Sequence, residues 1–148
     1  MLEVVATIEG LEELEQGLAE MPEVLGSETE QAIDQLLLLA QGRLATYPAQ
    51  AMGTRYRRTG LLGQMWAGAT HRVRRVSLPG GRMYVEGSVR NARPGVAYVQ
   101  DEGSQAEVHV GRWQTAQQVM AELQPEADQL LERAGERAVG QAATAPRG

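Results

Sequence analysis

The stretch HRVRRVSLPGGRMYVEGSVR, residues 71–90, contains the pattern that decides the fold class of this chain. Two segments rich in β-forming residues, 71–78 and 83–90, flank the turn sequence PGG at 79–81, which is typical of a β-hairpin. In the second segment, apolar and polar residues alternate as they do in a half-buried strand. The stretch therefore predicts two antiparallel strands.

Further strands are expected on both sides of the hairpin. Residues 2–8 alternate between an apolar side and a mixed side, and Gly10 ends this pattern. Residues 97–100 follow the loop sequence NARPG and are expected to form another short strand. The sheet would then contain about four strands, the hairpin included.

Two helices are predicted between the first strand and the hairpin. Apolar residues at helical spacing between Leu11 and Met21 predict a short amphipathic helix that ends before Pro22. Ser27 and Glu30 have the spacing of a capping box, which predicts the start of a second, longer helix.

The longer helix carries its apolar residues on one stripe and is expected to stop at Pro48. Leu38 and Leu39 widen this stripe, so we expect the helix to be covered on more than one side. The stripe consists of Ile33, Leu36, Leu37, Ala40, Leu44 and Tyr47.

The C-terminal part of the chain is also expected to be helical. Thr115 is a candidate N-cap for this region. Pro125 either begins a further helix or kinks a continuous one, because proline does not fit inside a helix. The residues from about 144 onward are expected to form a loosely ordered tail.

The order of these elements defines the fold class. Elements of one type are grouped along the chain, which is typical of an α+β domain. We expect a small antiparallel sheet with the long helix and the C-terminal helix packed on one face. Residues 1–148 form a single domain, because no internal repeat or linker interrupts the pattern.

The composition excludes several kinds of protein. The chain contains no cysteine, which rules out disulfides and zinc–thiolate sites. No apolar run approaches the ~20 residues of a membrane span, and the N-terminus is too acidic for a signal peptide. We therefore expect a soluble intracellular protein that makes no contact with a membrane.

Charge is segregated along the chain. Residues 1–38 contain ten acids and no base, residues 43–93 contain ten arginines and one acid, and residues 101–148 contain eight acids and four arginines. Such a chain has an acidic face and a basic face, unless folding brings them together. It can pair with copies of itself or present its basic middle to phosphate.

Candidate catalytic residues do not form a motif. His71 and His109 are 38 positions apart and lack the spacing of metal ligands. No serine lies in a GxSxG sequence, and neither LPGGR nor GLLG has the context of a phosphate-binding loop. We therefore expect no enzymatic activity, no metal and no cofactor.

Nucleic acid is an alternative partner for the basic middle. Its arginines alternate with Tyr56 and Trp66, an arrangement that suits phosphate contacts combined with base stacking. The isoelectric point of about 5.1 opposes this reading, because the rest of the chain would repel a polyanion. An arginine band facing an acidic neighbour accounts for both halves of the charge pattern.

Several motifs resemble those of a family of tailed-phage tail-completion proteins, also described as neck, head–tail joining or tail-terminator-like proteins. The first motif combines Tyr47-Pro48, Arg58-Thr59-Gly60, Leu62-Gly63 and Trp66. The second combines Ala97-Tyr98-Val99-Gln100 and Gly103, and His109 with Gly111-Arg112-Trp113 continues it. The opening GLEELEQGLAEMPEV, residues 10–24, is similar to the family's N-terminal helix.

Two features depart from the family pattern. Asp101 and Glu102 precede Gly103, where many relatives have a shorter connection. The C-terminal helix is interrupted by Pro125 and lacks the RPF motif that some relatives carry. These differences leave the subgroup open between tail completion, tail termination and a minor capsid-associated component.

The resemblance implies a structural virion protein in the phage neck, assembled in the host cytoplasm. Members of the family form a ring, typically six-fold, at the head-proximal end of the tail. The ring completes the tail tube and joins it to the head connector, so its partners are further copies of the chain, the connector or stopper protein and the tail tube protein. DNA only passes through the bore. The alternative is a DNA-contacting accessory protein that uses the arginine-rich middle segment.

Ring closure requires that one surface patch meet a different patch on the next copy. We expect acidic residues of the N-terminal third to pair with arginines of the middle segment across this contact. Trp66, Tyr98 and Trp113 would serve as core or interface anchors. The candidate interface residues are Arg55, Arg57, Arg58, Thr59, Gly60, Trp66, Arg72, Arg74, Arg75, Glu12, Glu13, Tyr98, Gln100 and Trp113.

Overall fold

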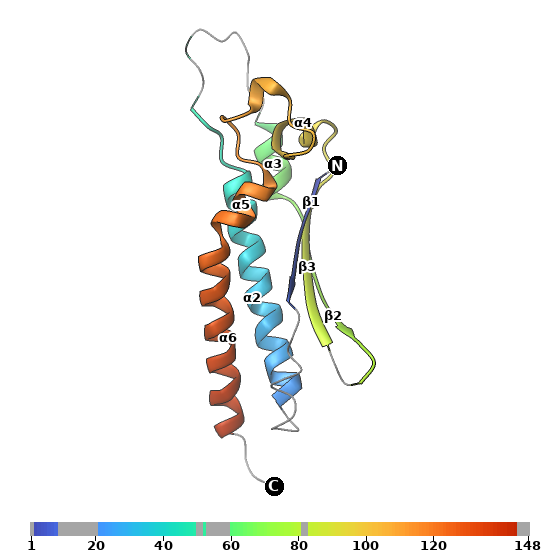
Figure 1. Cartoon of the computed structure of the whole chain (residues 1–148), viewed down its shortest axis with the longest axis vertical. Helices are drawn as coiled ribbons and strands as arrows, with labels where there is room; N and C mark the ends of the chain where they lie inside the picture. The colour runs from blue at the N-terminus through green and yellow to red at the C-terminus, as the bar shows by residue number, and fades with distance from the viewer. Residues whose placement is uncertain (1, 9–20, 50–51, 53–59, 81–82, 145–148) are drawn as a thin grey trace.

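A computed structural model describes residues 2–8, 21–49, 52, 60–80 and 83–144 (Figure 1). These residues form an α+β fold in which helices pack on one side of an antiparallel sheet, as predicted from the order of the elements. The predicted helix between Leu11 and Met21 falls mainly outside the described residues. So do the last four residues of the predicted tail.

Three strands form the sheet in the described part of the chain: β1 (Leu2–Ile8), β2 (His71–Ser77) and β3 (Met83–Asn91). Their spatial order is β1-β3-β2, with both pairs antiparallel. The predicted hairpin and the predicted first strand are therefore confirmed. The sheet has one strand fewer than expected, and β1 and β2 are its edges.

The long helix α2 (Met21–Leu44) packs against the inner face of the sheet. It begins before Ser27, so the predicted capping box at Ser27 and Glu30 was wrong. Pro22 is tolerated because the amide groups of the first helical turn have no partner within the helix. Ser27 and Glu30 therefore lie inside the helix.

The C-terminal region forms two helices, α5 (Ala116–Glu122) and α6 (Gln124–Thr144). Thr115 caps α5 through a capping box with Gln118, which confirms the predicted N-cap. Pro125 lies at the start of α6, so the chain begins a new helix there, one of the two alternatives that the sequence left open.

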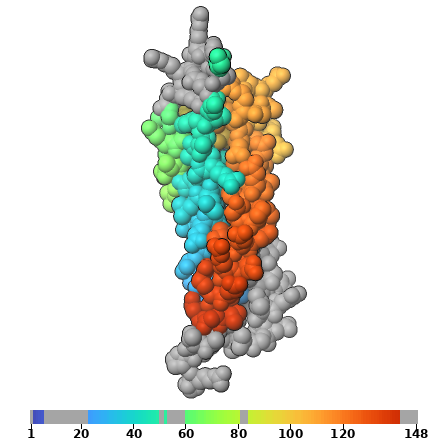
Figure 2. Space-filling model, turned by 90° about the vertical axis from the view of Figure 1, so that its left-hand side faces the viewer, coloured from blue at the N-terminus to red at the C-terminus, as the bar shows by residue number. Residues whose placement is uncertain are grey.

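α6 runs beside α2 on the side away from the sheet (Figure 1), and Figure 2 shows the two helices side by side on one face of the molecule. α2 is thus covered by the sheet and by α6, as its wide apolar stripe predicted. Leu38 and Leu39 are nevertheless 55% and 44% exposed. They lie on the part of α2 that neither neighbour covers.

Two short helices and a 3-10 turn gather at one end of the fold: α3 (Leu61–Ala67), α4 (Val96–Gln100) and η1 (Glu107–His109). The prediction of a strand at residues 97–100 was wrong, because this segment is α4. Helical spacing places Val96 and Gln100 on the same side of the segment, and both are buried.

Candidate functional site

Trp66 and Gln100 lie inside the single chain. Trp66 is fully buried on α3, and its Nε1 donates a hydrogen bond to Gln100 Oε1 at 2.8 Å. Gln100 Nε2 donates in turn to the backbone oxygen of Leu44 at 2.8 Å. The buried polar groups are satisfied by this network, which joins α2, α3 and α4. Both residues therefore hold one subunit together. For Trp66 this is one of the two roles that the sequence allowed, and Gln100 is removed from the predicted interface.

Tyr47 and Trp113 complete the same structural cluster. Their rings meet edge to face with centroids 5.1 Å apart, and Trp113 is buried. The Tyr47 hydroxyl accepts a hydrogen bond from the Gly63 amide at 2.9 Å. Trp113 is thus a core anchor, one of the two roles that the sequence allowed, and it is removed from the predicted interface. The motif residues described in this cluster build the α3–α4 end of the fold.

Gly60 and Tyr98 are two further residues of the predicted interface. Gly60 has a φ of 76° at the start of α3, a conformation that favours glycine. Tyr98 projects from α4 with 64% of its surface exposed, so it remains a candidate contact residue. Six further candidates lie outside the described residues, and their role stays a prediction: Glu12, Glu13, Arg55, Arg57, Arg58 and Thr59.

Arg75 is paired within the chain. It points from β2 toward α2, where its Nε donates to Glu30 at 2.5 Å and its Nη1 donates to Glu23 at 2.8 Å. Burial lowers the pKa of Arg75, but the hydrogen bonds to the two carboxylates outweigh this effect, so the pKa is raised. Folding has brought part of the acidic third against part of the arginine-rich segment.

Arg74 is also paired within the chain. Its Nη2 lies 2.6 Å from Glu86 Oε2, and its Nε donates to the same oxygen at 2.7 Å across the β2–β3 pair. The hydrogen bond to Glu86 raises the pKa of the Arg74 guanidinium. Pairing between protomers, as the sequence suggested for Arg74 and Arg75, is therefore replaced by pairing inside the subunit.

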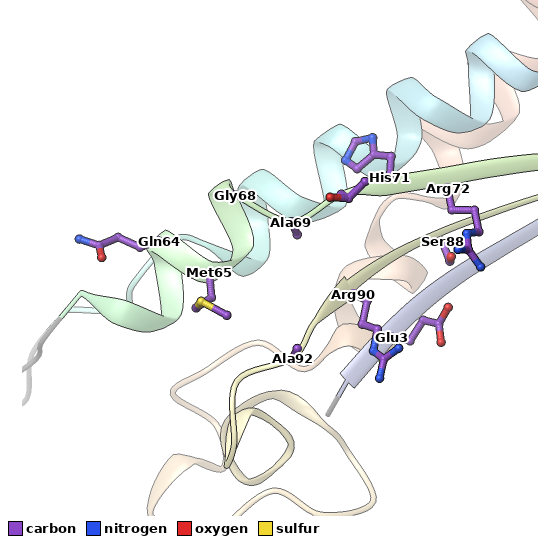
Figure 3. Close-up of a pocket in the computed structure, with 11 residues that line it drawn as sticks. Glu3, Gln64, Met65, Gly68, Ala69, His71, Arg72, Ser88, Arg90 and Ala92 are labelled. Atoms are coloured by element: carbon purple, nitrogen blue, oxygen red, sulfur yellow. The ribbon is translucent and has the colours of Figure 1, made fainter.

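Arg72 and Arg90 line an open groove of about 740 Å³ on the outer side of the sheet. Figure 3 shows the side chains of Arg72, Arg90 and Glu3 projecting from the three strands on the side away from α2. Met65 and Ala69 line the opposite wall, beside α3. Arg72 is exposed and has no hydrogen-bond or ion-pair partner among the described residues. The groove combines a floor that carries Glu3, Arg72 and Arg90 with an apolar wall.

An acidic stripe on α6 was missed by the sequence analysis. Asp128, Glu132 and Glu136 are exposed and follow one another at intervals of four residues. They lie opposite the buried Ala134 and Ala138, which face α2. The signal was present in the sequence, because carboxylates at i, i+4 and i+8 opposite an apolar stripe form one helix face.

Exposed apolar residues occur on α3, α4 and the η1 segment, which lie at one end of the fold (Figure 1). Tyr98 belongs to α4, and Val108, which is also 64% exposed, belongs to η1. A hydrogen bond from the Ala106 amide to the backbone carbonyl oxygen of Tyr98 at 2.7 Å holds these two segments together. The exposed apolar residues of this end are Leu61, Met65, Tyr98, Val108 and Val110.

The two histidines are held by neighbours in the fold. His71 Nδ1 lies 2.8 Å from Asp34 Oδ1, and its Nε2 lies 2.5 Å from Gln41 Oε1, so the ring links β2 to α2. His109 packs edge to face on Trp113, and burial, with a smaller effect of Arg112, lowers its pKa. Within the described part of the chain, no group of three or more His, Asp or Glu residues is placed to hold a metal ion.

Comparison with protein-family models, with curated proteins and with solved structures finds no match for this chain. Among the helices that the structure describes, none is long and apolar enough to cross a membrane. The surfaces of the fold are therefore the basis for a functional assignment.

Proposed function

We propose that this chain is a structural subunit that assembles into a ring in the neck of a tailed phage. The ring completes or terminates the tail and joins it to the head connector. The observation that carries this proposal is the exposed apolar end at α3, α4 and η1. A cluster of exposed apolar residues on a small domain is typical of a protein–protein contact.

The same end contains the described residues of two of the motifs that resemble the phage family. Trp66, Gln100 and Trp113 form its interior, while Tyr98 and Val108 form its surface. Tyrosine is enriched at interfaces because it combines a large apolar ring with a polar tip. In a ring, this end is suited to contact the protein above or below, namely the connector or the tail tube protein.

Sedimentation of the purified chain without DNA tests the proposal. We expect one discrete oligomer near six times the 16.1 kDa of a single chain. Its mass should be unchanged by moderate salt, because apolar burial is less sensitive to salt than surface ion pairs are. A species of one chain at every protein concentration would contradict the proposal.

A second measurement addresses the DNA-contacting alternative, which Arg72 and Arg90 in the outer groove favour. Binding of a short duplex is measured over a range of salt concentrations. A protein that uses phosphate contacts loses affinity steeply as salt rises. We expect weak binding, because the chain is acidic as a whole. Tight, steeply salt-dependent binding by a single chain would establish the alternative.

A further inference from the structure

We propose that neighbouring copies join through the two edges of the sheet, so that β2 of one copy pairs in parallel with β1 of the next. This inference rests on the proposed function, because it specifies how the ring subunits meet. Among the described residues, no fourth strand pairs with either edge. An edge strand presents backbone N–H and C=O groups to which a strand of another chain can add.

The two edges carry opposite charges. β1 contains one acid, Glu3, and no base, whereas β2 contains three arginines and no acid. Arg74 and Arg75 are paired within the chain, but Arg72 is exposed and has no hydrogen-bond or ion-pair partner among the described residues. Like charges on facing strands repel, so two β2 edges are poor partners for each other. Charge therefore selects a contact between β2 and β1.

β1 is well suited to accept another strand. Four of its seven residues, LEVVATI, are β-branched, and it has none of the proline or lysine residues with which many proteins protect an edge. Val5 is 48% exposed on the outer face, so a neighbouring strand would bury it. β2 is also seven residues long. The two edges can therefore pair over their full length.

The direction of the strands favours head-to-tail assembly. β1 and β2 are each antiparallel to β3, so they run in the same direction. Rotation about an axis roughly parallel to the strands keeps this direction, and β2 then meets β1 of the next copy in parallel. A contact between two different patches is heterologous, and it forms a ring when the rotation closes.

Full overlap of the edges fixes which residues meet. Within one sheet, Arg72 and Val5 both lie level with Ser88. Aligning the ends of β2 with those of β1 from the next copy instead places Arg72 beside Glu3. This shift is two residues, so the outer side chains of both strands stay on the same face. A sheet that closes on itself needs a stagger of this kind.

The contact leaves Arg90 within its own subunit. Glu3 lies level with Arg90 in the β1–β3 pair, and Figure 3 shows both side chains on the same side of the sheet as Arg72. An ionised carboxylate has two oxygens and accepts several hydrogen bonds. Glu3 can therefore accept from Arg72 of the neighbouring copy as a charge-assisted hydrogen bond while it remains beside its own Arg90.

Disulfide formation between copies tests the pairing directly, because the wild-type chain contains no cysteine. We expect co-expressed Glu3→Cys and Arg72→Cys chains, one of them tagged, to form a covalent dimer of one tagged and one untagged chain under mild oxidation. Each variant alone should form none. Arg112→Cys is the matched control for Arg72→Cys, since Arg112 is an exposed arginine near η1 and outside the sheet. It should not link to Glu3→Cys.

The double variant Glu3→Cys/Arg72→Cys reports on ring closure. Within one chain, β3 separates the two edges, which places their backbones about 9–10 Å apart. A disulfide requires Cα atoms within about 7 Å, so the two thiols of one chain cannot join. Denaturing electrophoresis of the oxidised protein should show a ladder of linked chains that ends at the size of the ring.

A lysine on the β1 edge tests the same contact without cysteines. We expect Val5→Lys to raise the protein concentration at half-assembly by about tenfold or more, because full overlap places residue 5 beside Arg74 of the neighbour. Val139→Lys is the matched control, since Val139 is a similarly exposed valine on α6. It should assemble as the wild type does, and circular dichroism with thermal melting checks that both variants are folded.

The results separate this interface from the proposed function. If the wild type assembles but the mixed disulfide does not form, or Val5→Lys assembles as Val139→Lys does, the edge contact is wrong and the proposed function stands. Covalent dimers of Glu3→Cys alone or Arg72→Cys alone would show contact between like edges and would also overturn it. A wild-type chain that never assembles would overturn both proposals.

Discussion

Gly87 lies at the centre of β3, where α2 comes closest to the sheet. A Cβ atom at this position would overlap the Ile33 side chain and would lie 3.0 Å from Leu37 Cδ1. Both neighbours are buried residues of α2. The absence of a side chain at one position therefore sets the distance between the two main layers of the fold.

We expect Gly87→Ala to destabilise the chain by about 1–3 kcal/mol, because the added methyl group overpacks a filled core. The measurement is the midpoint of urea unfolding, followed by circular dichroism. Gly42→Ala is the matched control, since nothing lies within 4 Å of a Cβ at Gly42 of α2. It should stabilise the helix by about 0.5–1 kcal/mol. Equal midpoints for the two variants would contradict this account of the packing.

The sequence could not separate core aromatic residues from interface residues. A large apolar side chain is favoured in both places, so Trp66 and Trp113 satisfied either prediction. Gln100 was assigned to an interface, yet it is buried with Trp66 Nε1 and the Leu44 backbone oxygen as partners. These partners lie 34 and 56 positions away along the chain, and no local pattern identifies them.

At the level of elements, α2 and α6 are joined by ion pairs at both ends of their contact. Arg43 Nη1 lies 3.1 Å from Glu122 Oε2 of α5, and its Nη2 lies 3.7 Å from Glu126 of α6. At the other end, buried Glu28 accepts hydrogen bonds from Arg137 Nε at 2.6 Å and from Gln141 Nε2 at 2.7 Å. The Glu28 contact is better shielded from water than the ion pairs of Arg43 are.

The Glu28 contact makes stability depend on pH. The hydrogen bond from Arg137 lowers the pKa of Glu28 below its ordinary 4.5, with burial opposing and Gln141 adding to this effect. A carboxyl whose pKa is lower in the folded state contributes stability above its unfolded pKa. That contribution is lost as the pH falls through the folded pKa.

We expect Glu28→Gln to lower the free energy of unfolding by about 1–3 kcal/mol at neutral pH, because a charged hydrogen bond is lost. The difference from the wild type should shrink at pH values below the folded pKa of Glu28, where the wild type has also lost the charge. Urea unfolding at several pH values measures this. Glu107→Gln, at an exposed position on η1, should stay within about 0.5 kcal/mol of the wild type. A difference that does not change with pH would refute the assignment.

Element prediction succeeded where the periodic pattern was long. The hairpin and the apolar stripe of α2 span many residues, and both are present as expected. It failed at the segment 97–100, because four residues cannot distinguish a period of two from a period of 3.6. It also misplaced the start of α2, since Ser27 satisfies the rule for a cap while Pro22 is equally compatible with a first turn.

At the scale of the whole molecule, the charges that are segregated along the sequence fall into two groups. One part is neutralised inside the subunit, where Arg75 meets Glu23 and Glu30. The other part remains exposed, with Arg72 at the sheet groove and Glu132 on the far side of α6. Composition could reveal the imbalance, but only the fold shows which charges remain available to a neighbour.

In the proposed ring, neighbouring subunits and the proteins above or below the ring contact different parts of the molecule. The edge strands β1 and β2 run along the length of the elongated fold, whereas the apolar residues of α3, α4 and η1 form one end (Figure 1). Subunits joined by their sides would present these ends together on one rim of a ring. In the proposed ring, this rim would be the apolar surface on which a neighbouring protein docks.

Electron-microscope projections of the purified chain, without DNA or other phage proteins, test the central claim most directly. We expect class averages that show closed rings of a single size with rotational symmetry and a central opening. Particles of one chain, or compact oligomers without an opening, would contradict a ring-forming subunit.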